Sequence, residues 1–181
     1  MIRYVKTTVL IFVFLVLMTA SCRKEKGDKY YGTTTIDNTL YGTGPYYALG
    51  FSFDLGIEVR TSDSPGPDIT VHAITDVNSV PTGAYLDTPN LVESFSLVGK
   101  GDNENDAKTL FDNLRETEAT QWMLFANTIE EHQVWLFKTS GGNYVKIRIV
   151  DLLVNEGLSG PYAEVTFEWR MQPDGSTTFS G

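Results

Sequence analysis

The sequence has 181 residues, of which 23 are acidic and 14 basic, so its net charge at pH 7 is −9. A surface this acidic repels phosphate backbones, and nucleic acid is therefore not an expected partner. The chain holds one cysteine, so no disulfide within the chain is expected.

The first 21 residues have the three-part layout of an export signal. Arg3 and Lys6 precede an uncharged apolar run over residues 9–18, and small residues 19–21 follow it. This run of 10 residues is shorter than the roughly 20 that a membrane-spanning helix needs. We therefore expect residues 1–21 to be a signal peptide.

Cys22 follows directly after these small residues, in a pattern that resembles the bacterial lipobox. In a lipobox the thiol is joined to diacylglycerol, and the alternative is an ordinary secretory signal followed by a free thiol. Each buried methylene contributes about 0.8 kcal/mol, so two or three acyl chains such as palmitate anchor a protein durably. The sequence predicts lipidation at Cys22, a polar tether over residues 22–31, and attachment to a membrane without crossing it.

Cleavage before Cys22 would leave 181 − 21 = 160 residues. A chain of this length usually folds as one domain with a sizeable core. We therefore expect a single domain over residues 32–181. With Cys22 lipidated, no thiol remains for a cysteine nucleophile or a thiolate metal site.

Most of this domain has the alternating pattern of β-strands. The clearest case is "YVKIRIV", residues 144–150, where one face is predicted to be buried and the other to be wet. Before it, "QVWLFK", residues 133–138, predicts a second strand, and "TSGGN" between them supplies the glycines of a hairpin turn. The predicted buried face comprises Val145, Ile147 and Ile149, and the predicted wet face comprises Tyr144, Lys146 and Arg148.

Further strands are predicted upstream and downstream of this hairpin. "AEVTFEWR", residues 163–170, alternates again and is followed by a turn at 173–175 and a short final strand. Residues 76–85 are predicted to form a loop. The remaining predicted strands cover residues 46–53, 56–60, 68–74 and 93–98.

One stretch, residues 106–119, has the apolar stripe of an amphipathic helix, with Asp106 as its predicted N-cap. A single helix among so many strands predicts a mostly β fold, either an antiparallel sandwich or an open barrel with one short helix.

Several segments resemble the HmuY-like haem-binding lipoproteins of Gram-negative outer membranes. They are "TIDNTLYGTGPYYALGFSF", "GIEV", "DITVH", "WMLFA", "VWLFKTSGGNYVKIRIVD" and "AEVTFEWRMQPDG", in the order of the family. The resemblance implies a mostly β fold that holds haem through two axial side chains. It also implies a non-enzymatic protein for iron acquisition that is attached to the outer membrane, on its periplasmic or surface face, and passes haem to an outer-membrane receptor.

Haem iron takes axial donors such as histidine or methionine, and the mature chain offers few of them. The candidate haem-binding residues are His132, Met123 and His72. Each has an alternative role: a solvated surface residue for His132, a core filler for Met123 and a hydrogen-bonded structural histidine for His72. Where the family places a ligand after its tryptophan-containing strand, this chain has Asn127.

Other chemistry has weaker support in the sequence. Asp102, Glu104 and Asp106 have the spacing of a calcium loop but lack its glycine and its final glutamate, so no metal other than haem iron is expected. No catalytic motif is present. The alternative to a haem carrier is a relative without haem ligation that acts as a surface binding or interaction module.

Overall fold

The computed structural model describes residues 30–44, 47–90, 92–119 and 121–179. The predicted signal peptide and Cys22 lie outside these residues. The described elements, in chain order, are β1 (Tyr31–Asp37), β2 (Leu49–Ser52), β3 (Ile57–Arg60), β4 (Thr70–Thr75), β5 (Pro81–Asp87), β6 (Phe95–Lys100), α2 (Glu104–Asn113), β7 (Phe125–Ala126), β8 (Gln133–Lys138), β9 (Tyr144–Gly157) and β10 (Gly160–Gln172).

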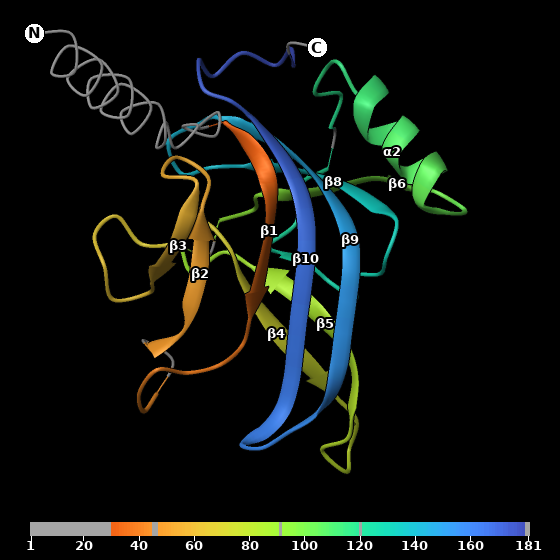
Figure 1. Cartoon of the computed structure of the whole chain (residues 1–181). Helices are drawn as coiled ribbons and strands as arrows, with labels where there is room; N and C mark the ends of the chain where they lie inside the picture. Colours follow the sequence, from red (N-terminus) through yellow and green to blue (C-terminus); the bar gives the residue numbers. More distant parts are fainter. Residues whose placement is uncertain (1–29, 45–46, 91, 120, 180–181) are drawn as a thin grey trace, which may run out of the picture.

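The strands form three antiparallel sheets arranged in layers (Figure 1). A large sheet has the order β1-β10-β9-β8-β6, and two small sheets, β2-β3 and β4-β5-β7, pack against its inner face. The prediction of a mostly β, antiparallel fold with one short helix is confirmed, and the sheets stack as a sandwich.

The core lies between the large sheet and the small sheets. Aromatic rings meet edge to face across it, as the quadrupoles of such rings favour. Phe51 of β2 lies 5.7 Å from Phe167 and 5.2 Å from Trp169 of β10, measured between ring centroids. Fully burying a side chain of this size contributes about 1.5–3 kcal/mol, so these contacts hold the layers together.

The predicted hairpin of β8 and β9 is confirmed. Its turn is closed by a hydrogen bond of 2.9 Å from the Thr139 N–H to the Asn143 carbonyl, and Gly142 has φ +84°, a backbone conformation that glycine adopts without strain. Val145, Ile147 and Ile149 are fully buried, as predicted.

The prediction that the other face of β9 is wet is wrong. Lys146 and Arg148 on that face are 0% and 5% exposed. Helix α2 packs against this outer face of the large sheet, and its Phe111 carbonyl accepts a hydrogen bond from Lys146 Nζ. The alternation of β9 is therefore that of a strand covered on both faces.

Helix α2 begins earlier and ends earlier than predicted. Its N-cap is Asn103, whose side chain accepts hydrogen bonds from the N–H groups of Asn105 and Asp106, so the prediction of Asp106 as the cap is wrong. The helix ends at Asn113, and Leu114 is extended with ψ 100°. Residues 114–119 were predicted to continue the helix and instead form an extended segment.

Two strands were not predicted. Residues 81–87, expected mostly as loop, form β5, and β1 was not expected as a strand. β7 ends at Ala126, directly before Asn127, where the resemblance implies the end of a tryptophan-containing strand. β1 begins at Tyr31, the last residue of the predicted tether, and pairs with β10 over its whole length. β1 is an edge strand, whereas β5 has seven residues and lies between β4 and β7. Tertiary pairing determines these strands.

Candidate functional site

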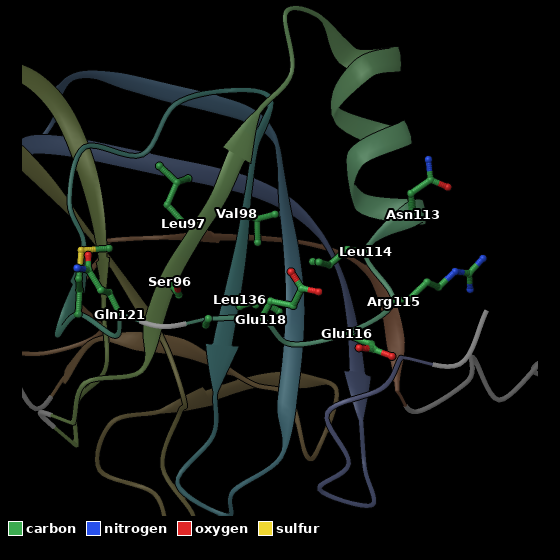
Figure 2. Close-up of a pocket in the computed structure, with 12 residues that line it drawn as sticks. Ser96, Leu97, Val98, Asn113, Leu114, Arg115, Glu116, Glu118, Gln121 and Leu136 are labelled. Atoms are coloured by element: carbon green, nitrogen blue, oxygen red, sulfur yellow. The ribbon is translucent and has the colours of Figure 1, made fainter.

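A pocket of about 680 Å³ lies on the outer face of the large sheet, between β6 and the chain that follows α2 (Figure 2). This volume is within the range of roughly 300–1,000 Å³ that small-molecule sites have. The lining residues are Ser96, Leu97, Val98, Asn113, Leu114, Arg115, Glu116, Glu118, Ala119, Gln121, Met123 and Leu136.

The floor of the pocket is formed by strands β6 and β8. Ser96 of β6 is directly opposite Leu136 of β8 in the antiparallel register, and residues paired in this way point to the same face. Leu136 is 2% exposed. A β-bulge between Leu97 and Gly99 bends β6 at this point. The floor is therefore largely apolar and rigid.

One wall begins where helix α2 ends. The last four carbonyls of a helix have no partner within the helix, and here a buried lysine supplies one. Lys146 Nζ donates hydrogen bonds of 2.7 Å to the Phe111 carbonyl and 3.1 Å to the Leu114 carbonyl. A cation at this end also interacts favourably with the helix dipole. Lys146 thus fixes the point at which the helix gives way to the wall.

The rest of this wall, residues 114–119, is held by the end of the chain. The Phe179 N–H donates to the Arg115 carbonyl at 2.7 Å, and the Thr117 N–H donates to the Thr177 carbonyl at 2.8 Å. Between these bonds Glu116 pairs with Thr178 as an isolated antiparallel bridge. We call residues 114–119 the wall segment, and its backbone is fixed without a ligand.

The extended form of the wall segment decides which side chains face the pocket. Alternate residues of an extended chain point to opposite sides, so Leu114, Glu116 and Glu118 share one side. Figure 2 shows the side chains of Leu114 and Glu118 directed over the sheet, and the Arg115 guanidinium directed away from the pocket. The wall thus directs the carboxylate of Glu118, and not the guanidinium of Arg115, over the sheet.

Burial lowers the pKa of Lys146 to about 8, with further lowering from the nearby positive charges of Arg170 and Arg115. The ammonium also lies 4.7 Å from the ring centre of Phe111 and 5.4 Å from that of Phe179, distances at which a cation is attracted to an aromatic face. Lys146 therefore carries a positive charge at neutral pH and uses it to hold the wall.

Met123 lies at the edge of this pocket. Its N–H donates to the Phe95 carbonyl at 2.8 Å, and it accepts from the Phe95 N–H at 3.0 Å. Met123 is among the residues that line the pocket and is 41% exposed. The alternative role of core filler is wrong for Met123. That role belongs to Met171, which is 3% exposed and part of the core.

His132 lies at the other end of β6. Its carbonyl accepts a hydrogen bond from the Gly101 N–H, whereas Met123 pairs with Phe95. The strand between these two points spans roughly 17–20 Å. The structure therefore does not bring Met123 and His132 together around one iron atom.

The alternative role of His132, a solvated surface residue, requires an exposed side chain. Its side chain is only partly exposed. The residue is half-buried with φ +71°. Its Nδ1 is buried and has no hydrogen-bond partner within the part of the chain that the structure describes.

His72 lies on the outer face of the sheet formed by β4 and β5. Its Nε2 is 3.1 Å from Thr70 Oγ1 and 3.2 Å from Asp87 Oδ1, and its ring stacks on Tyr85. Burial acts to raise the pKa of Asp87, but hydrogen bonds from His72 and Thr70 outweigh it and hold that pKa below its usual value. The role of a hydrogen-bonded structural histidine is confirmed for His72.

These positions do not fit a haem held by two of the three predicted ligands. Among the described residues that line the pocket, Met123 is the one side chain with a usual axial donor atom for haem iron. Nε2 of His72 is already bonded to Thr70 and Asp87, and His132 is too distant from Met123. No group of three or more metal-ligating side chains occurs within the described ranges.

The sequence reasoning missed most of this site. It predicted helix over the wall segment, and it assigned Lys146 to a wet face. A signal was available in retrospect: the three-residue spacing of apolar positions in α2 ends at Leu114, and polar residues dominate from Arg115 to Glu118.

No protein-family model matches this chain, and no curated protein matches it. In the described residues, no helix has both the length and the apolar character that crossing a membrane requires.

Proposed function

We propose that this chain is a lipid-anchored envelope protein that binds a small organic ligand in the pocket beside β6 and is not an enzyme. The observation that carries the proposal is the cavity of about 680 Å³ with an apolar floor and a wall held by Lys146 and the chain end. Sites of this size, largely preformed and with a few polar groups around an apolar base, are typical of small-molecule binding.

Of the two alternatives from the sequence, we favour a surface binding module that lacks haem ligation over a carrier that holds haem through two axial side chains. Haem carries two anionic propionates, and the pocket lining contains Glu116 and Glu118, whose charge repels them. The separation of Met123 from His132 along β6 supports the same choice.

The envelope location in this proposal rests on the sequence. The export-like segment 1–21, Cys22 and the segments that resemble HmuY-like lipoproteins support lipid attachment at the outer membrane. An outer-membrane receptor that takes over the bound ligand is the partner that this resemblance implies.

A solvatochromic dye tests the pocket. Nile red, which is neutral, gains fluorescence when it enters an apolar cavity, and we expect this gain with the wild-type protein. Val98→Trp places a large ring in the pocket and is expected to abolish the gain. The control is Val80→Trp, because Val80 is 52% exposed and remote from the pocket lining. Equal dye binding by both variants and the wild type would remove the proposal.

One observation favours a second candidate function. Met123 is one of the residues that line the pocket, and thioether sulfur is a soft ligand that suits ferrous haem. Haem bound through Met123 alone would give a spectrum that changes on reduction and is lost in Met123→Ala but not in Met123→His. A haemin spectrum that is identical for the wild type and Met123→Ala removes this candidate.

A further inference from the structure

We infer that the ligand of this pocket is an organic cation with an apolar body, such as an amine attached to an aromatic ring system. The inference rests on the proposed function and adds the chemical class of the ligand. It follows from which charged groups line the cavity and which charged groups are kept out of it.

The negative groups of the wall belong to the lining of the cavity. Glu118 extends over the sheet beside Leu114 in Figure 2, and Glu116 also lines the pocket. Within the described ranges, neither carboxylate forms an ion pair with a basic side chain. Both therefore have accepting oxygens for a ligand ammonium, which forms charge-assisted hydrogen bonds.

The positive groups near the cavity do not point into it. Arg115 belongs to the lining by position, but its guanidinium points away from the pocket in Figure 2. Lys146 is fully buried, and its ammonium donates to the carbonyls of Phe111 and Leu114. An anionic ligand would find carboxylates and no directed cation at this wall.

The remaining lining completes the recognition of such a ligand. Val98, Leu114 and Leu136 provide the apolar surface for its body, and Met123 at the edge provides a polarisable thioether that packs well against aromatic rings. The net charge of −9 also raises the local concentration of cations around the protein.

A matched series of indole compounds tests the sign of the ligand charge. Tryptamine is a cation, tryptophol is neutral and indole-3-propionate is an anion, and all three share one ring system. Their binding is measured by equilibrium dialysis against the full-length protein in nanodiscs of zwitterionic lipid, with empty nanodiscs as the blank. We expect tryptamine to bind more tightly than tryptophol, and indole-3-propionate to bind most weakly.

Substitutions then locate the effect. Glu118→Gln is expected to weaken tryptamine binding about two- to fivefold, the range for a pair of charges in contact with water, and to leave tryptophol binding unchanged. Glu131→Gln, at an exposed turn outside the lining, is the control and should change neither. Val98→Trp should abolish binding of both compounds.

The outcomes separate the inference from the proposed function. Equal binding of tryptamine and tryptophol, insensitive to Glu118→Gln but lost in Val98→Trp, overturns the cation inference and leaves the pocket as a ligand site. If indole-3-propionate binds most tightly of the three and this binding is lost in Val98→Trp, the cation inference is again overturned and the pocket remains a ligand site. Failure of all three compounds to bind overturns both.

Discussion

Lys146 Nζ lies 3.1 Å from the main-chain oxygen of Leu114, so a fully buried cation holds the residue at which helix α2 ends and the pocket wall begins. This single side chain joins the large sheet, the helix and the wall segment. The shape of the pocket therefore depends on a residue that does not line it.

Lys146→Met should weaken ligand binding, and it should lower stability at high pH. Methionine retains the apolar packing of the side chain but leaves the carbonyls of Phe111 and Leu114 without this donor, which costs about 1–3 kcal/mol in the free energy of unfolding where the lysine is neutral. At pH 7 the removal of a buried charge offsets this loss. Urea denaturation followed by tryptophan fluorescence measures this loss, and Nile red titration measures the weakened pocket. The control is Lys100→Met, which removes an exposed ion pair with Glu130 and should cost less than about 1 kcal/mol.

The same lysine should give a distinctive pH dependence of stability. Its folded pKa of about 8 is below its ordinary value of 10.5, so between these two values the unfolded chain binds more protons. Stability then rises with pH across that window, by up to about 3 kcal/mol from this group. Subtracting the pH profile of Lys146→Met from that of the wild type isolates the effect. A difference profile that is flat between pH 8 and 10.5 would contradict it.

Asp68→Asn should stabilise the protein at neutral pH. Burial raises the pKa of Asp68 to about 6, so the folded state holds a proton more tightly than the unfolded state between pH 3.8 and 6, and stability falls as pH rises through that window. Asparagine keeps an acceptor for the Phe53 N–H, which donates to Asp68 Oδ2 at 2.8 Å, and removes a buried charge. We expect a gain of about 1–3 kcal/mol at pH 7.

The matched control for this prediction is Asp63→Asn. Asp63 also accepts a main-chain hydrogen bond, from the Arg60 N–H, but is exposed. The urea midpoints of wild type and Asp68→Asn should differ more at pH 7 than at pH 4, because wild-type Asp68 is protonated in the folded state at pH 4. The midpoints of wild type and Asp63→Asn should not show this pH-dependent difference. A lower urea midpoint for Asp68→Asn than for wild type at pH 7 would contradict the prediction.

Gly101→Ala should disturb the docking of helix α2. A Cβ at Gly101 would lie 2.3 Å from the Ala107 nitrogen and 2.7 Å from the Ala107 Cα, so the helix must move. Overpacking of this kind typically costs about 1–3 kcal/mol. Gly83→Ala is the control, since its nearest neighbour would be Ile74 Cδ1 at 3.7 Å. In thermal unfolding, Gly101→Ala should have a clearly lower midpoint than Gly83→Ala. Equal midpoints would show that helix α2 moves to accept the added Cβ without loss of stability.

Local pattern was sufficient for much of the sandwich. Strand β8 begins and ends at the predicted residues 133 and 138, and β9 buries the predicted Val145, Ile147 and Ile149. In these strands the period-two alternation and the burial agree, so the sequence alone determines the face that each side chain occupies.

The candidate site was not predictable in the same way, because distant parts of the chain create it. The wall segment is extended since Lys146 and Phe179 bind its carbonyls, and both lie more than 30 residues further along the chain. Helical periodicity over residues 106–119 contains no information about these partners. Tertiary hydrogen bonds here override local helix propensity.

Haemin titration of the wild type, Met123→Ala, His132→Ala and His72→Ala, followed by absorption in both oxidation states, tests the central claim most directly. The account predicts no sharp, red-shifted Soret band that depends on a histidine, because Met123 and His132 lie at opposite ends of β6 and Nε2 of His72 is already bonded to Thr70 and Asp87. A sharp band that is lost both in Met123→Ala and in one of the histidine variants would contradict it.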